Sequence, residues 1–232
     1  MSIDNLNLAA RFSGIFNPAA FLYNVLIVGA GSVGSNVALH LAKMGIRDIT
    51  VIDRDTISME NIGVSLVYGF NDIGKPKVNV LKERIKELTD TEINAINDIV
   101  TEKTNWLKNH HIVIAAVDTI TARKNIINSI INGDNIKTLL YIDTAMGGMN
   151  LTAEAIDIMN NANHLYEYTK YINSLSETDI PDLPCAARST LHGTSILASY
   201  VQFIIIQYAA NGKIQTGEKY KFNLTIFDKV II

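Results

Sequence analysis

The chain has 232 residues, of which 48% are hydrophobic and 19% charged, and a formal net charge of −3. This length and balance are typical of one large globular α/β domain with a substantial core. The slightly negative charge, without a cluster of Lys or Arg, argues against a general nucleic-acid-binding protein. A single cysteine excludes an internal disulfide framework and a cysteine-rich zinc site.

Residues 1–21 form a short N-terminal lead that lacks a basic start followed by an apolar run. We therefore expect no signal peptide and a cytoplasmic protein. The most apolar late stretch, residues 196–210, carries Ser199, Gln202 and Gln207. We expect it to be too short and too polar to span a bilayer.

Strands and helices are expected to alternate along the first two thirds of the chain. Apolar runs predict strands at residues 25–28, 49–52, 93–99, 112–117 and 139–142, and helical patterns predict helices at 32–44, 77–88 and 121–131. This alternation predicts an α/β fold with a Rossmann-like, doubly wound, mostly parallel sheet and helices on both faces. We expect residues 1–232 to form a single nucleotide-binding domain.

The pattern changes after Asp143. Residues 149–158 are expected to form a strand beside the sheet, residues 188–210 one long buried helix, and residues 221–231 a closing strand in a C-terminal antiparallel extension. The polar stretch at residues 158–186 is long for a connection. We therefore predict a mobile crossover loop over a site.

The first predicted strand leads into the sequence GAGSVG, residues 29–34, and then into a helix. Gly29, Gly31 and Gly34 would let the backbone turn and approach a phosphate, which the N–H groups at the helix start would bind. Asp53 ends the second strand nineteen residues after Gly34, where a carboxylate can accept hydrogen bonds from a ribose diol. The alternative is a glycine turn that serves only packing. The pattern predicts nucleotide binding and leaves NAD, FAD, S-adenosylmethionine and ATP open.

Three acidic residues stand at the ends of predicted strands: Asp53, Asp118 and Asp143. Because ligands of open parallel sheets bind at the carboxyl ends of the strands, all three can face one crevice. An acidic cluster beside bound phosphates is what a magnesium site requires.

Five motifs carry a resemblance to a known family. In chain order they are GAGSVG, DITVIDRDTISMENIG, NDIGKPKV, VIAAVDTITAR and PCAARSTLHGTSILASYVQ. The chain thus resembles the ThiF/MoeB-type adenylyltransferases, which share the fold of the ubiquitin-activating enzymes. The resemblance implies ATP and Mg²⁺ as cofactors, a homodimer, and a small ubiquitin-like or sulfur-carrier protein, or a peptide, as substrate. The C-terminal carboxylate of that substrate would attack the α-phosphate of ATP and give an acyl-adenylate and pyrophosphate.

This reaction needs no general base, because an α-carboxyl with a pKa of roughly 3.5 is already ionised at pH 7. The protein must instead bring two anions together and neutralise the charge that builds on the phosphates. The resemblance assigns Asp118 to magnesium, Lys77 to the ATP phosphates and Asn61 to the phosphate side. The alternatives are a helix N-cap for Asp118, a solvated lysine for Lys77 and a loop cap for Asn61. Lys75 is a second candidate for the lysine.

The resemblance also assigns Asp55 and Arg123 to the nucleotide site. Asp55 would assist locally, or it is an ordinary turn residue. Arg123 would position Asp118, or it forms a surface ion pair. Arg11 resembles by location an arginine that the partner subunit offers in family dimers, against the alternative of a surface arginine.

One departure from the family pattern is serious. Family members usually carry an arginine and a glutamine three and four residues after the asparagine, and here Val64 and Ser65 stand there. Either another arginine supplies the charge, or the protein adenylates poorly, or it is a scaffold subunit.

Cys185 stands seventeen residues before Gln202, the spacing seen in relatives whose cysteine takes part in thioester or persulfide chemistry. The start of a helix and Arg188 would lower the pKa of its thiol. The alternative is a small buried hydrophobic residue. The paired CxxC motifs of the family are absent, so we expect no structural metal, and we expect His164 and His192 to face solvent or to cap helices.

The sequence therefore predicts an ATP-dependent adenylyltransferase. Two alternatives remain: a catalytically weakened partner or scaffold subunit, which Val64 suggests, and an NAD-dependent Rossmann oxidoreductase. Asp53 would suit NAD, but the oxidoreductase would leave GKPKV and the D-x4-R element at 118–123 unexplained.

Overall fold

The computed structural model describes residues 10–104, 106–132, 136–147, 150–179, 189–213 and 220–225. Within these ranges seven strands form one sheet in the order β3-β2-β1-β4-β5-β6-β7. The first five pair in parallel and the last two antiparallel: β1 (Val25–Val28), β2 (Ile49–Ile52), β3 (Asn94–Ile96), β4 (Ile112–Ala115), β5 (Leu140–Gly147), β6 (Asn150–Asp157) and β7 (Tyr220–Thr225). The predicted doubly wound, mostly parallel sheet with an antiparallel extension is confirmed.

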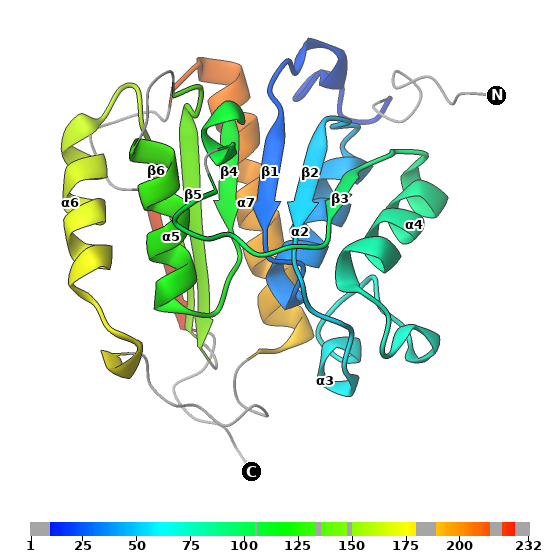
Figure 1. Cartoon of the computed structure of the whole chain (residues 1–232). Helices are drawn as coiled ribbons and strands as arrows, with labels where there is room; N and C mark the ends of the chain where they lie inside the picture. The colour runs from blue at the N-terminus through cyan, green and yellow to red at the C-terminus, as the bar shows by residue number, and fades with distance from the viewer. Residues whose placement is uncertain are drawn as a thin grey trace.

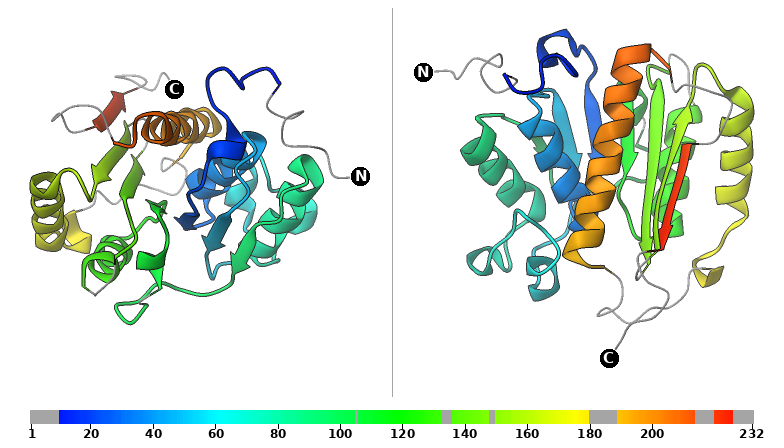
Figure 2. Two further views of the ribbon diagram at one scale, coloured as in Figure 1. Left: turned by 90° about the horizontal axis from the view of Figure 1, so that it is seen from above. Right: turned by 180° about the vertical axis from the view of Figure 1, so that it is seen from behind.

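Helices cover both faces of the sheet (Figures 1 and 2). Helices α2 (Ser32–Lys43), α4 (Lys77–Thr89) and α7 (Leu191–Asn211) pack on one face, and α5 (Ile120–Ile131) and α6 (Ala162–Ser174) on the other. Successive residues of β1 alternate between the two cores, and all four are buried. This double burial is why the central strands read as uninterrupted apolar runs.

Short helices connect the larger elements: η1 (Pro18–Ala20), α3 (Met59–Ile62), η2 (Phe70–Asp72), η3 (Leu107–Asn109) and η4 (Glu177–Asp179). From β1 to β3 the chain adds strands on one side of β1, and from β4 onward it adds them on the other side, so the strand order reverses between the neighbours β1 and β4. In open α/β sheets this switch point opens the crevice in which ligands bind. The carboxyl ends of β1 and β4 are therefore the place to look for a site.

Within the described residues, several strand boundaries differ from the prediction by one or two residues, and two differ by three or more. β3 ends at Ile96 rather than residue 99, because residues 97–99 leave the sheet in an exposed turn in which Asp98 Oδ1 accepts a hydrogen bond from Ile99 N at 2.7 Å. β5 runs five residues past the predicted end at 142, because pairing with β6 extends it to Gly147.

The prediction of a mobile loop at residues 158–186 is wrong for much of its length. Residues 162–174 form α6, with Asn161 Oδ1 capping its first turn, and residues 177–179 form η4. Only one narrow stripe of α6 is buried, consisting of His164, Tyr168 and Ile172 at four-residue spacing. The polar residues around this stripe concealed the helix in the sequence. Residues 180–186 lie outside the described ranges, and there the loop stays a prediction.

Helix α7 has 21 residues, more than the stretch of 196–210 that we considered too short to span a bilayer. By length and composition it is the one helix of the described part of the chain that could cross a membrane. Its buried residues pack against α2 and the sheet, as in a core helix.

Candidate functional site

The glycine loop joins the carboxyl end of β1 to α2 beside β4. Gly29 has φ +100°, and a Cβ there would lie 2.3 Å from the carbonyl oxygen of Ala116. A Cβ on Gly34 would lie 1.8 Å from the carbonyl oxygen of Gly29. Packing alone explains these two glycines. Gly31 is different, because its φ is −72° and nothing lies within 4 Å of the position of a Cβ.

The start of α2 is left open for an anion. Gly31 is its N-cap residue, no side chain caps the helix, and its first turn carries no acidic residue. The unpaired N–H groups of a first helical turn and the positive end of the helix dipole attract negative charge. Together with the open space at Gly31, this fits a phosphate group.

Asp53 fixes the glycine loop to the turn after β2. Its Oδ2 accepts a hydrogen bond from Ala30 N, and its Oδ1 accepts one from Asp55 N, both at 2.7 Å. Each carboxylate oxygen has a second lone pair, so a contact with a ribose diol stays a prediction. The side chain of Asp53 therefore has a structural task as well.

Tyr68 supports the same loop, and sequence analysis missed it because no motif marks this position. Its hydroxyl donates to the carbonyl oxygen of Ala30 at 2.7 Å. Burial raises the pKa of Tyr68, and the charges of Asp53 and Asp72 raise it further, so the phenol stays neutral and serves as a donor.

Lys77 is buried at the first turn of α4, with a side chain 10% exposed. Its Nζ lies 3.0 Å from Oδ2 of Asp55, whose side chain is 60% exposed, and its backbone N donates to the carbonyl oxygen of Asp55 at 2.9 Å. The alternative of a solvated lysine is therefore wrong. Asp55 holds the Lys77 ammonium at the rim of the crevice.

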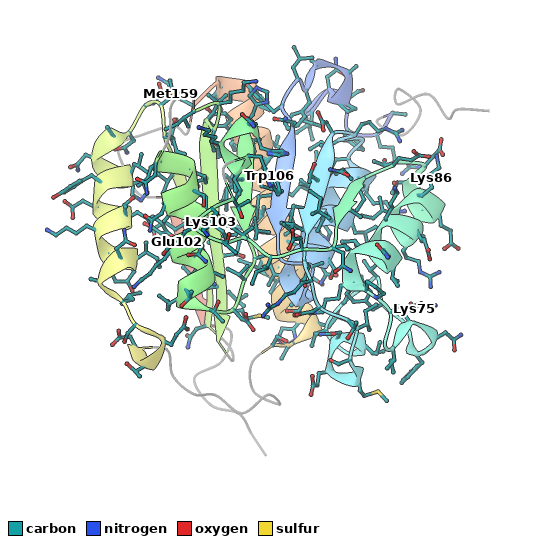
Figure 3. All side chains as sticks on the ribbon, viewed as in Figure 1. Lys75, Lys86, Glu102, Lys103, Trp106 and Met159 are labelled. Carbon is teal, nitrogen blue, oxygen red and sulfur yellow. The ribbon has the colours of Figure 1, made fainter. Side chains whose placement is uncertain are left out.

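Lys75, the second candidate for this role, lies in the turn before α4 (Figure 3). Its side chain is 54% exposed and its Nζ lies 3.3 Å from Oδ1 of the buried Asp72. The Gly69 N–H group, followed by Lys75 and Arg84, lowers the pKa of Asp72. Lys75 therefore stabilises a buried carboxylate in its turn.

Asn61 caps the short helix α3 through its side-chain oxygen. This oxygen accepts hydrogen bonds from Ser58 N at 2.9 Å and from Ser58 Oγ at 3.2 Å. The alternative of a loop cap therefore accounts for the side-chain oxygen of Asn61. The side-chain nitrogen of Asn61 contacts no acceptor in the part of the chain that the structure describes, so a role at the phosphates stays a prediction.

The segment with Val64 and Ser65 is anchored to two helices and supplies no cation. Ser65 Oγ lies 2.9 Å from Ser35 Oγ on α2. Thr194 Oγ1 on α7 donates to the carbonyl oxygen of Val64 at 3.0 Å, and Asn36 Nδ2 donates to Thr194 Oγ1 at 2.9 Å. The departure from the family pattern thus replaces charge by a packed, hydrogen-bonded segment.

Asp118 follows β4 and is exposed. The N-cap alternative for Asp118 is wrong, because the cap of α5 is Thr119, whose Oγ1 accepts a hydrogen bond from Ala122 N at 3.2 Å. Asp118 forms no hydrogen bond or ion pair with any residue of the described ranges. Since β1 and β4 are paired in register, this free carboxylate follows the strand that lies beside the glycine loop.

A magnesium ion is compatible with this arrangement. The described residues hold no group of three or more His, Cys, Asp or Glu side chains that could bind a metal alone. Mg²⁺ is commonly bound by one or two carboxylates together with substrate phosphates. A free Asp118 beside an open helix start fits that kind of site.

The prediction that Asp143 faces the crevice is wrong. Because β6 extends β5, Asp143 lies within the strand rather than at its end, and its carboxylate forms an ion pair with the buried Arg123. Nη2 of Arg123 donates to the carbonyl oxygens of Val117 at 2.5 Å and Thr144 at 2.8 Å. Arg123 is therefore neither a surface residue nor directed at a ligand; it holds the turn just before Asp118.

His164 also differs from the expectation. It is buried on α6, and its Nε2 lies 2.8 Å from Oε1 of Glu154 on β6. Glu154 is the cross-strand partner of Asp143, so two buried carboxylates lie side by side, one paired with Arg123 and one with His164. Burying a charge is costly unless it is paired, which explains why Arg123 lies against Asp143.

The remaining predicted residues lie elsewhere. Arg11 is exposed. Its segment lies at the amino ends of the parallel strands, whereas α3 lies near their carboxyl ends (Figure 1). Arg11 therefore does not reach the crevice of its own subunit. Cys185 and Arg188 lie outside the described residues. His192 is exposed, as expected.

The fold is shared with solved structures of known proteins. The crystal structure of Escherichia coli MccB with AMPCPP and MccA has a TM-score of 0.67 and 18% identity, covering 96% of this chain and 72% of that one. Escherichia coli tRNA N6-threonylcarbamoyladenosine dehydratase in complex with ATP has a TM-score of 0.65 and 18% identity, covering 88% and 95%.

The chain is also similar in sequence to known proteins. The NEDD8-activating enzyme E1 catalytic subunit of Schizosaccharomyces pombe is 32% identical over 108 residues, which are 46% of this chain and 24% of that protein. The probable molybdopterin-synthase adenylyltransferase of Gracilaria tenuistipitata var. liui is 31% identical over 102 residues, 43% of this chain and 29% of that protein. The chain thus matches about a quarter of the length of these relatives. The model of the ThiF family matches residues 19–150, more than half of the chain, and the chain belongs to this family.

Proposed function

We propose that the protein is an ATP-dependent adenylyltransferase. It activates the C-terminal carboxylate of a small ubiquitin-like or sulfur-carrier protein, or of a peptide, as an acyl-adenylate. A carboxylate oxygen bonds to the α-phosphorus of ATP, the bond from that phosphorus to the bridging oxygen breaks, and pyrophosphate leaves. The observation that carries the proposal is the free Asp118 carboxylate after β4, next to an uncapped α2 and the open space at Gly31.

The residues of the crevice have separate tasks in this reaction. The N–H groups of α2 and the ammonium of Lys77 bind phosphate oxygens, and Asp55 keeps Lys77 in place. Asp118 would hold Mg²⁺, which would neutralise phosphate charge. Asp53 and Asn61 orient the nucleotide through their remaining acceptor and donor groups. Arg123 fixes the turn from behind rather than contacting ATP.

A homodimer completes the site in this proposal. Arg11 lies too far from its own crevice, so it serves the crevice of the partner subunit and supplies charge that Val64 does not. Each subunit contributes a ThiF-like domain, and the protein acts in the cytoplasm. After adenylation, the thiolate of Cys185 attacks the carbonyl carbon of the acyl-adenylate, forming a thioester and releasing AMP, or Cys185 takes part in sulfur transfer.

The relatives support the class of reaction and differ in the substrate. One is named a NEDD8-activating enzyme subunit, one a probable molybdopterin-synthase adenylyltransferase, and MccB was solved with MccA and a nucleotide. The alternative of a weakened partner subunit is favoured by one observation, the absence of a cation at Val64 and Ser65.

Exchange of labelled pyrophosphate into ATP tests the proposal. Wild-type protein is expected to catalyse exchange only in the presence of a carrier protein or peptide with a free C-terminus. Asp118→Asn should lower the rate of exchange about a hundredfold or more, whereas Asp48→Asn, which changes an exposed acid just before the amino end of β2, should leave it unchanged. Binding of the carrier without ATP and without exchange would favour the partner subunit, and stabilisation by NAD but not ATP would favour the oxidoreductase.

A further inference from the structure

The first turn of α5 differs from that of α2 because it is fully capped. Thr119 Oγ1 accepts a hydrogen bond from Ala122 N. The backbone N–H groups of the two residues before Ala122 both donate to the carboxylate of Glu177. Ile120 N donates to Oε2 at 3.1 Å and Thr121 N to Oε1 at 2.7 Å. Glu177 belongs to η4, more than fifty residues further along the chain. A side chain from a distant segment thus closes the helix that follows Asp118.

The segment that presents Glu177 is held in place by a second contact. Lys124 Nζ on α5 donates to the carbonyl oxygen of Leu175 at 2.6 Å. Within the segment, Asp179 Oδ2 accepts hydrogen bonds from Ser176 N at 2.6 Å and Ser176 Oγ at 2.8 Å. Residues 175–179 are therefore clamped along the first turns of α5. The hydrogen bond from Thr121 N lowers the pKa of Glu177, so its carboxylate is charged at neutral pH.

This clamp lies directly beside Asp118, the residue to which we assign the metal. Asp118 forms no hydrogen bond or ion pair with the residues that the structure describes, so its orientation depends on the backbone turn that carries it. Arg123 holds that turn on one side through the carbonyl oxygen of Val117. Glu177 holds it on the other side through Ile120 N and Thr121 N. The turn is thus fixed both immediately before and immediately after Asp118 and Thr119.

We propose that Glu177 is a positioning residue for Asp118: it fixes the first turn of α5 and thereby the direction in which the Asp118 carboxylate meets the metal–nucleotide complex. This inference rests on the proposed function. It assigns a task to the connection after α6 that does not involve contact with the substrate. It also explains why the charged side chain of an exposed residue accepts hydrogen bonds from two backbone N–H groups of α5.

Glu177→Gln is the first test, since glutamine has one acceptor oxygen and no charge. We expect kcat for pyrophosphate exchange to fall about tenfold while KM for ATP changes by less than about twofold, because the contacts of the glycine loop are untouched. The Mg²⁺ concentration that gives half the maximal rate should rise several-fold. Glu167→Gln is the matched control, because Glu167 is exposed on α6 and forms no hydrogen bond or ion pair with the residues that the structure describes, and it should leave all three quantities unchanged.

A double-mutant cycle separates positioning from general destabilisation. If Glu177 acts through Asp118, then Glu177→Gln has no further effect on the residual rate of Asp118→Asn. Fully additive effects of the two substitutions would overturn the proposal. Amide hydrogen exchange supplies the structural readout: Ile120 and Thr121 should exchange faster in Glu177→Gln than in the wild type, and the amides of α2 should not.

Metal binding distinguishes failure of this inference from failure of the proposed function. Mn²⁺ can be titrated into the protein with the non-hydrolysable analogue AMPCPP and followed by electron paramagnetic resonance. Both Asp118→Asn and Glu177→Gln should weaken Mn²⁺ binding, even if no carrier supports exchange. Wild-type Mn²⁺ affinity in Glu177→Gln would refute the positioning role, whether or not the protein adenylates a substrate.

Discussion

The three glycines of the loop after β1 should respond differently to the same substitution. A methyl group on Gly34 would lie 1.8 Å from the carbonyl oxygen of Gly29, which is backbone and can yield only if α2 moves. Overpacking of this kind costs about 1–3 kcal/mol and occasionally more. For a domain of this size each kcal/mol lowers Tm by about 2–4 °C, so Gly34→Ala should lower Tm by several degrees or prevent folding.

Gly31→Ala should leave stability nearly unchanged. Its φ of −72° suits any residue, and nothing lies within 4 Å of the new Cβ. Alanine is a poorer N-cap than glycine but reduces the entropy of the unfolded chain, and these effects of up to about 1 kcal/mol oppose each other. The methyl group would instead enter the space in which we place a phosphate. We therefore expect the Kd for ATP to rise about tenfold or more, which is about 1.4 kcal/mol.

Thermal unfolding and calorimetric titration with ATP measure the two effects separately. Gly14→Ala is the control, because Gly14 also has nothing within 4 Å and belongs to the segment at the amino ends of the parallel strands. It should change neither Tm nor Kd. If Gly31→Ala bound ATP with wild-type affinity, no phosphate would approach this backbone, and our placement of the nucleotide would be wrong.

Three further outcomes follow from the same geometry. Asp118→Ala should lower the rate of pyrophosphate exchange about a hundredfold or more, because the carboxylate acts where phosphate charge develops; near-wild-type exchange would remove the mechanism. Asp143→Ala leaves the Arg123 guanidinium buried without a counter-charge and should lower the free energy of unfolding in urea by about 3–5 kcal/mol, whereas a loss below about 1 kcal/mol would mean that the pair is not buried in solution. The lowered pKa of Asp72 stabilises the fold above the unfolded pKa of 3.8, and this contribution is lost as the pH falls through the folded value. Urea titrations at pH 7 and pH 3 should therefore show a larger acid loss in the wild type than in Asp72→Asn, and equal losses would contradict the assignment.

The first half of the fold could be predicted from the sequence because its signals are local. An apolar run, a glycine turn and a helical pattern follow one another within twenty residues, and the predicted starts of α2 and α4 agree with the structure. Asp53 and Asp118 were predicted from their places at the ends of strands, and Lys77 from the resemblance to the family. These features depend on residues that are close to one another in the sequence, and local patterns of apolar, glycine and charged residues therefore reveal them.

The tertiary structure decided what depends on residues distant in the sequence. Asp143 was predicted to face the crevice, but pairing with β6 places it within β5, where Arg123 neutralises it. Helix α6 escaped detection because it buries only a narrow stripe. The contacts of Tyr68 with the glycine loop and of Glu177 with α5 join segments 38 and 57 residues apart.

The sequence by itself thus determined the order of the strands and of helices α2, α4, α5 and α7, the glycine loop and the identity of the charged groups. Only the tertiary structure decided which of these charged groups form buried ion pairs and which have no partner among the described residues. The physical reason is that a buried charge or a bare helix end must find a partner, and the nearest partner in space is often far away in the chain. Asp118 has no such partner among the residues that the structure describes, and for that reason it is the residue on which the proposed chemistry depends.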